Sequence, residues 1–265
     1  MSNDDTPDDL PWDDSEFLNE HREAAEAGDA EAQYLFGRAH IRCLDFAPDY
    51  AEAIKWWRKA ADQEHAASCF SLGSCFEEGN GVPCDQVEAA KWFRKAADQQ
   101  HADGCLSLGS CYEEGKGVPL DQVEAAKWFR KAAELGHEVA QFWLGMLYRR
   151  GVGLPRDNNE AANWFRKAAD QGVSDAQYNL GLLYLIGRGV SKNEAEAAAW
   201  FLKAAEQGQV DAEFGLGLMH ESGRAVPKDI EEAIRWYRRA AEHGEEAALE
   251  KLRELGLDSH QPPSI

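Results

Sequence analysis

The chain has no long apolar run and no export signal at its start. No apolar stretch in its 265 residues approaches the roughly 20 that a membrane-spanning helix needs. The first nine residues are acidic, whereas a secretory signal would be basic and then apolar. The sequence therefore predicts a cytoplasmic protein without a membrane partner.

Basic residues are also scarce. The chain has 28 Lys and Arg against 48 Asp and Glu, which gives a formal net charge of −20 at pH 7. Nucleic acids are bound largely by Lys and Arg side chains that displace counterions from the phosphates. A nucleic-acid partner is therefore not expected, and the acidic balance favours solubility and basic partners.

The side chains that could act in catalysis do not form a recognisable catalytic pattern in the sequence. Threonine occurs once, the serines are scattered, and none of them sits in a nucleophile elbow. Gly-x-Gly pairs are frequent, but each lies between predicted helices, without the preceding strand and the lysine of a phosphate-binding loop. We predict no enzyme activity, no cofactor and no small-molecule substrate.

What the sequence does contain is one unit repeated along the chain. Tryptophan recurs at intervals of 36 residues, and a glycine column keeps the same interval. A sustained period of this length predicts a repeat protein whose core runs lengthwise and whose contacts are local. The two columns are Trp56, Trp92, Trp128, Trp164, Trp200 and Trp236, and Gly37, Gly73, Gly109, Gly145, Gly181 and Gly217.

Each unit reads as two helices joined by a loop of the form Gly-x-Gly-Val-Pro-x-Asp, as in residues 79–85. Apolar residues recur at helical spacing before the loop, and Ala89, Trp92 and Ala96 form one apolar face after it. Glycine ends the first helix, and proline prevents its continuation. The glycine inside the first helix is expected to let a neighbouring helix approach, despite a propensity cost of about 1 kcal/mol.

The residue after each loop is expected to cap the second helix, and a Glu three residues later to complete a capping box. Capping accounts for these acidic residues without a further function. The basic pairs that follow the tryptophans, such as Arg94/Lys95 and Arg130/Lys131, are expected to complement the helix dipole and to remain solvated. The capping pairs are Asp49/Glu52, Asp85/Glu88, Asp121/Glu124, Asp157/Glu160, Asn193/Glu196 and Asp229/Glu232.

Six full units begin near Ala30, Ala66, Ala102, Glu138, Ser174 and Val210. A capping helix over residues 15–28, with Glu20 in the tryptophan position, precedes them, and a closing helix runs from Glu246 to Leu255. Trp12 either covers the first helix or forms a short docking motif. The predicted organisation is an acidic disordered segment over residues 1–14, a repeat solenoid over 15–256 and a flexible tail over 257–265.

Cysteines and histidines also recur in columns. Cys69 and Cys105 share one repeat position, and Cys75 and Cys111 share another. Residues one repeat apart are separated by more than the Cα distance of about 7 Å that a disulfide allows, so free thiols in a reducing cytosol are expected. Three histidines at the ends of second helices are likewise too far apart to share a metal ion, and no metal site is expected. They are His65, His101 and His137.

The repeated motif Ala-x-x-x-Leu-Gly-x-x-Tyr-x-x-Gly-x-Gly-Val-Pro-x-Asp-x-x-x-Ala-x-x-Trp-Phe-x-Lys-Ala-Ala resembles the Sel1-like repeat, a branch of the tetratricopeptide class, over residues 15–256. The resemblance implies an all-α, right-handed superhelical solenoid whose first helices line the concave side. It implies an adaptor or scaffold without catalytic residues. The first unit departs from the motif, because residues 41–48 lack both loop glycines.

A cysteine-rich branch of this family pairs cysteines across the two helices of a repeat and has a suggested β-lactam-binding or hydrolysing activity. In this chain no second helix carries a cysteine between its tryptophan and its alanine pair. A β-lactam-type hydrolase is therefore the least favoured of the alternatives.

Two columns near the end of the first helix change character from unit to unit and are expected to be exposed. They divide the expected concave groove into three zones. An exposed apolar patch bordered by charge is typical of a protein-binding site, although the loop or the next unit could instead cover it. The acidic zone is Glu77, Glu78, Glu113 and Glu114, the basic zone is Arg149 and Arg150, and the apolar zone is Leu182, Leu185 and Ile186.

These patterns predict a non-enzymatic adaptor that holds another polypeptide in its groove. Charge complementarity would speed association and a few apolar anchors would provide affinity, so the partner should carry basic and large apolar residues. The alternative is an immunity or inhibitor protein that neutralises a basic toxin or enzyme.

Overall fold

The computed structural model describes residues 21–42 and 47–257, and within these ranges the regular structure is helical throughout. The predicted segment 1–14, including Trp12, and residues 258–265 lie outside the described residues. The chain divides into two compact units, each described here by itself. Unit 1 is Met1–Ala140 with Val152–Leu154, and unit 2 is Gln141–Gly151 with Pro155–Ile265.

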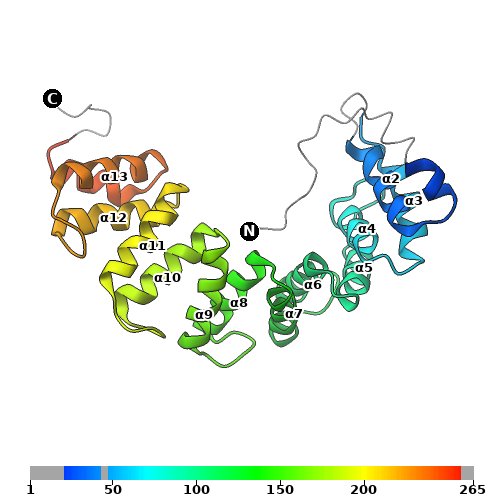
Figure 1. The fold of residues 1–265 in the computed structure, drawn as a ribbon, viewed down its shortest axis with the longest axis horizontal. Helices are drawn as coiled ribbons and strands as arrows, with labels where there is room; N and C mark the ends of the chain where they lie inside the picture. Colours follow the sequence, from blue (N-terminus) through cyan, green and yellow to red (C-terminus); the bar gives the residue numbers. More distant parts are fainter. Residues whose placement is uncertain (1–20, 43–46, 258–265) are drawn as a thin grey trace. The chain divides into compact units, whose positions relative to one another are not determined.

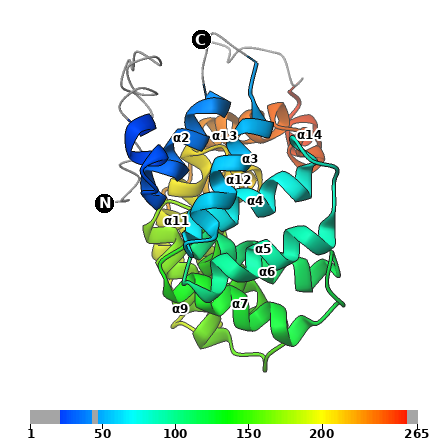
Figure 2. The ribbon, with the colours of Figure 1, turned by 90° about the vertical axis from the view of Figure 1, so that its right-hand side faces the viewer.

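The described helices pack in pairs that follow the order of the sequence (Figures 1 and 2). Even-numbered helices are the first helices of repeats, and odd-numbered ones are the second. The predicted all-α repeat architecture is confirmed for these residues. Unit 1 contains α2 (Ala30–Arg42), α3 (Tyr50–Ala61), α4 (Ala66–Glu78), α5 (Gln86–Asp98), α6 (Ala102–Glu114) and α7 (Gln122–Glu134). Unit 2 contains most of α8 (Glu138–Arg150), then α9 (Asn158–Asp170), α10 (Ser174–Ile186), α11 (Glu194–Glu206), α12 (Val210–Ser222), α13 (Ile230–Glu242) and α14 (Glu246–Glu254).

The loop between paired helices forms as its sequence predicts. Gly79 ends α4 in the left-handed region at φ 78°, and Asp85 Oδ1 accepts hydrogen bonds from the backbone N–H groups of Val87 and Glu88, both at 3.0 Å. The second half of the predicted capping box is absent at this cap. The Asp85 N–H instead donates to the Phe76 carbonyl at 2.9 Å, which ties the loop back to α4. The side chain of Glu88 is therefore left to pair with Lys91.

The core is built where a first-helix glycine faces an aromatic ring. A Cβ atom on Gly145 would stand 2.7 Å from Phe165 Cδ1, and one on Gly181 would stand 2.7 Å from Phe201 Cδ1. These glycines therefore let the second helix of the same repeat approach, as expected, and an aromatic ring of that helix fills the space. In both repeats the aromatic residue that fills the space follows the column tryptophan by one position. Phe165 is completely buried.

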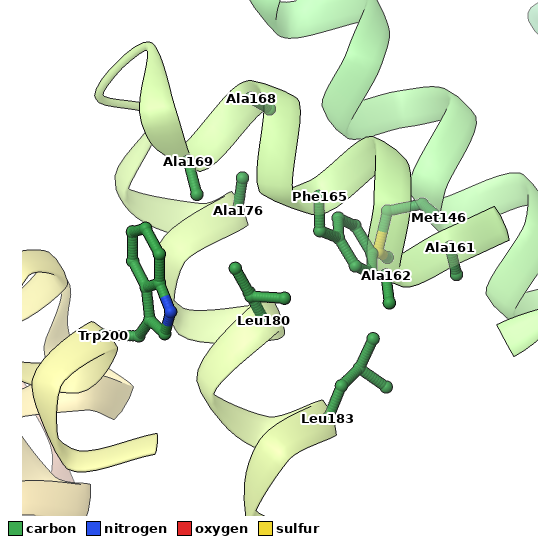
Figure 3. Close-up of a cluster of buried hydrophobic side chains, with 10 residues drawn as sticks. All are labelled: Met146, Ala161, Ala162, Phe165, Ala168, Ala169, Ala176, Leu180, Leu183 and Trp200. Atoms are coloured by element: carbon green, nitrogen blue, oxygen red, sulfur yellow. The ribbon is translucent and has the colours of Figure 1, made fainter. Parts of the chain in front are cut away.

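The tryptophans pack beside these rings. Trp200 on α11 points toward Leu180 and Ala176 of α10, in the cluster that also contains Phe165 (Figure 3). Four members of the column are buried, whereas Trp92 and Trp128 are half-buried. Each hairpin therefore buries its apolar face only together with a neighbour, as expected of a repeat that is too small to fold alone.

Candidate functional site

The basic side chains of the second helices are used within the fold. We expected them to remain solvated, but Arg94 is half-buried, and its guanidinium donates a hydrogen bond to the hydroxyl of Tyr112 in the next repeat. The Lys95 ammonium lies 3.9 Å from the ring centroid of Trp92, and Lys131 Nζ donates to the Ala97 carbonyl at 2.9 Å. The Arg94 and Lys131 contacts link neighbouring repeats, whereas the cation–π contact of Lys95 lies within α5 and leaves this side chain exposed, as expected.

The histidines at the junctions cap the helices that follow them. His65 Nδ1 accepts a hydrogen bond from the Ser68 N–H at 3.2 Å, and its Nε2 donates to Glu31 at 3.0 Å. His137 has the same geometry, with its Nε2 3.1 Å from Asp103 Oδ1. This hydrogen bond raises the pKa of His137 and lowers the pKa of Asp103. These rings therefore cap the next helix and pack at the junction between repeats.

The thiols that the structure describes are unpaired, and burial shifts the pKa of two of them. Burial raises the pKa of Cys75 and Cys111 to about 11, so both thiols stay protonated at neutral pH. The five described cysteines are unpaired. In residues 21–42 and 47–257, no three His, Cys, Asp or Glu side chains are grouped so that they could hold a metal ion.

The predicted acidic zone lies in unit 1, at the C-terminal ends of α4 and α6. Desolvation raises the pKa of Glu77, and the charges of Glu78 and Glu114 act in the same direction against Lys116, which places these carboxylates close together. Lys116 pairs with Glu114 at 2.5 Å. Glu113 is half-buried, and Glu78 and Glu114 are exposed. The zone is therefore a cluster of carboxylates that one lysine partly neutralises.

The predicted basic zone lies in unit 2. Arg149 is half-buried, and its Nη1 donates to Asn179 Oδ1 at 2.5 Å. The Asn179 amide donates in turn to the Asp175 carbonyl at 2.7 Å. Arg150 is exposed. Arg149 is therefore held against the next first helix, α10, whereas Arg150 faces solvent.

The predicted apolar zone, also in unit 2, is partly covered. Leu182 and Leu185 are half-buried against the cluster that contains Leu216 and Met219 of α12. Ile186, in contrast, has 53% of its surface exposed. The alternative interpretation, that neighbouring residues cover the zone, therefore holds in part for Leu182 and Leu185. It does not hold for Ile186, which is exposed.

Two apolar residues on the first helices of unit 2 were not predicted from the sequence as part of the candidate site. Leu218, 39% exposed, occupies on α12 the position that Leu182 holds on α10. Trp143 on α8 is half-buried and is the one tryptophan on a described first helix. A signal was available, because the other repeats place Leu, Ser, Asn or Gly where Trp143 stands.

Paired helices stacked in sequence order, with glycine facing an aromatic ring in each pair, define a helical-repeat protein. The family model for the Sel1 repeat matches the chain six times, and the chain belongs to the Sel1 repeat family. The matched residues are 30–65, 66–101, 102–137, 139–173, 174–209 and 210–245.

Solved structures of the same family are similar over most of the chain. The c5321 protective antigen of uropathogenic Escherichia coli, which has an SLR fold, is 34% identical with a TM-score of 0.85; the match covers 93% of this chain and 53% of the antigen, so this chain spans about half its length. A Sel1 repeat protein of Oxalobacter formigenes is 32% identical with a TM-score of 0.69, over 90% of this chain and 89% of that protein.

Two further comparisons add little about function. An immunity protein of Pseudomonas aeruginosa, Pa5087, is 22% identical with a TM-score of 0.44, over 80% of this chain and 81% of that protein, which is too distant to carry an argument. A search of curated proteins finds no match.

Among the described helices, none is long and apolar enough to cross a membrane.

Proposed function

We propose that the chain is a non-enzymatic adaptor or scaffold that holds a partner polypeptide on the faces of its first helices. The supporting observation is that exposed positions near the ends of the first helices differ in character between repeats. Glu78 and Glu114 are exposed on α4 and α6, whereas Arg150 and Ile186 are exposed on α8 and α10. The proposed contact residues are Glu77, Glu78, Glu113, Glu114, Arg149, Arg150, Leu182, Leu185 and Ile186.

A buried thiol and two junction imidazoles have structural roles, which supports a function without catalysis. The Cys75 thiol is buried with a raised pKa, and the Nδ1 atoms of His65 and His101 accept hydrogen bonds from helix N-termini. The described cysteines are free thiols, as in proteins of a reducing compartment, so we place the adaptor in the cytosol. A partner rich in basic and large apolar residues would complement the acidic and apolar zones.

Affinity capture from the native cytosol tests the proposal through matched variants. Ile186→Asp and the pair Glu78→Lys with Glu114→Lys should each lose the captured partner, because they alter exposed anchors and charges. Leu185 is unsuitable, because it packs against the neighbouring core and its substitution would disturb the fold. Leu202→Asp, at a 42% exposed site on the second helix α11, is the control.

Each variant should keep the helical circular dichroism signal of the unmodified chain. Identical sets of captured proteins from all variants would contradict the proposal. Capture of one basic protein in a tight stoichiometric complex would instead favour the inhibitor alternative.

A further inference from the structure

One loop of unit 1 contains an asparagine followed directly by a glycine. Asn80 and Gly81 lie between α4 and α5, and no other asparagine of the chain precedes a glycine. Three other repeats carry a basic residue at the position of Asn80, namely Lys116, Arg188 and Arg224. The repeat fold therefore does not require an asparagine there, and the chemistry of this pair is separable from the fold.

An asparagine side chain is open to attack by the backbone nitrogen of the residue that follows it. The nitrogen gives up its proton to a base in the solvent and bonds to the Cγ atom, which closes a succinimide ring and expels the amide group as ammonia. Water then opens the ring at either of its two carbonyls, and the products are aspartate and isoaspartate. A following glycine favours this reaction, because it has no side chain to shield its nitrogen and is conformationally permissive.

The structure leaves the attacking nitrogen available. The Asn80 N–H donates to the Cys75 carbonyl at 3.0 Å, which completes the hydrogen bonding at the end of α4. The Gly81 N–H, in contrast, has no acceptor among the described residues, and Gly81 has a φ angle of 72°, in the left-handed region. The Gly81 nitrogen can therefore lose its proton without breaking a hydrogen bond of the described fold.

The side chain that would react belongs to the surroundings of the acidic zone. Asn80 is half-buried, and its Nδ2 donates to Glu78 Oε2 at 2.6 Å. Deamidation replaces this donor by a carboxylate oxygen, so the hydrogen bond is lost and two like charges lie close together. The reaction therefore adds one negative charge to the acidic zone.

The isoaspartate product also lengthens the main chain by one methylene group. Gly81 lies against the preceding repeat, because a Cβ atom there would stand 2.6 Å from Tyr50 Cβ at the start of α3. Val82 and Tyr50 pack against the same apolar cluster. We therefore expect the longer chain to disturb the contact between this loop and α3.

We infer that Asn80 is a site of spontaneous deamidation, at which the folded chain gains a carboxylate beside Glu78 as it ages. The reaction needs only water as co-reactant. The inference does not rest on the adaptor function, because it concerns the covalent structure of the chain alone.

Incubation of the folded chain at mildly alkaline pH in water labelled with oxygen-18 tests this inference. Digestion in ordinary water and mass spectrometry follow, so that label reports only the reaction that took place before digestion. The peptide that contains Asn80 should lose its amide group and gain the label. The peptides that contain Asn179 and Asn193 should stay unlabelled, because the residues that follow these asparagines are Leu180 and Glu194.

Asn80→Arg is the matched variant, because Arg188 and Arg224 stand at the equivalent position in other repeats. Anion-exchange chromatography of the aged chain should resolve a form with one added negative charge, and Asn80→Arg should not produce it. Hydrogen exchange in α3 and α4 should be faster in the aged chain than in the fresh one, and unchanged by ageing in the variant. Thermal melts of the fresh proteins show that both are folded.

An Asn80 peptide that stays unlabelled in the folded chain would overturn the inference. Label that enters only after the chain is unfolded in urea would show that the fold protects this amide. Labelling of Asn80 that is no faster than that of Asn179 and Asn193 would also overturn it, because the glycine that follows Asn80 would then have no effect.

Discussion

Two side chains occupy turns that glycine fills in the other repeats. Glu64 and Gln100 follow the second helices with φ angles of 64° and 62°, in the left-handed region, where the equivalent residue elsewhere is Gly136 or Gly172. A side chain costs roughly 1–2 kcal/mol in this conformation. The junctions after α3 and α5 therefore store backbone strain that the junctions with glycine avoid.

Glu64→Gly and Gln100→Gly should each raise the free energy of unfolding by up to about 1 kcal/mol, because relief of strain exceeds the added entropy of the unfolded chain. Denaturant titration followed by circular dichroism measures this change. Gly172→Ala is the matched reverse substitution. A Cβ atom there meets nothing within 4 Å, so a loss of about 1 kcal/mol would report backbone strain alone. Destabilisation by both glycine variants would contradict this account.

Two histidines one repeat apart should titrate in opposite directions from their ordinary pKa of 6.5. The hydrogen bond to Asp103 raises the pKa of His137, while desolvation lowers the pKa of His101, whose Nδ1 is 3.8 Å from Asp103 and whose ring stacks on Phe70. His65 also disfavours protonation of His101, and Glu138 favours that of His137. Imidazole NMR should therefore place the midpoints on either side of 6.5.

The two shifts contribute to stability in opposite pH ranges. The stabilising contribution of His137 is present below pH 6.5 and is lost as pH rises through its folded pKa. That of His101 is present above pH 6.5 and is lost as pH falls through its folded pKa. Asp103→Asn should lower the midpoint of His137, and an unchanged midpoint would contradict the assigned hydrogen bond.

At the scale of the helix, the sequence predicts best what neighbouring residues decide. Glycine at the end of α4 and Asp85 before α5 act within their own loop, so their roles follow from the local pattern. The missing half of the capping box depends on the Phe76 carbonyl, nine residues away and in another helix. The Arg94 contact with Tyr112 crosses to the next repeat, which explains why a solvated arginine was the wrong expectation.

The fit between glycine and ring can be tested at one hairpin. Gly145→Ala should lower the free energy of unfolding by about 2–3 kcal/mol, since its Cβ atom would stand 2.7 Å from a ring that is fully buried. Phe165→Leu should recover part of this loss in the double variant, and denaturant titration of the four proteins of the cycle measures the coupling. Gly215→Ala, inside α12, controls for the added methyl group, because its Cβ atom would stand 3.4 Å from the nearest atoms. Additive losses would show that the ring does not occupy the glycine's space.

At the scale of the molecule, the strongest contacts between described helices join neighbours in sequence. This is why a 36-residue period suffices to predict the architecture. The candidate site is less predictable, because a variable column tells which positions lie outside the common core and does not tell what covers them. Leu185 packs against a cluster that includes residues of the next repeat, and Arg149 bonds to Asn179, 30 residues away, whereas Leu218 stays exposed.

A chain stabilised by nearest-neighbour contacts should confine damage to the repeat that receives it. Leu252 is 1% exposed and packs with Tyr237 and Ala248 at the C-terminal end of unit 2. Leu252→Ala should therefore cost about 2–4 kcal/mol locally, and hydrogen exchange should accelerate in α13 and α14 while the helices of unit 1 keep their protection. Arg253→Ala, at the exposed position next to it, should leave every exchange rate unchanged. Uniform acceleration in both units would show instead that the chain unfolds as one cooperative body, and stability could then no longer be treated as a sum over neighbouring repeats.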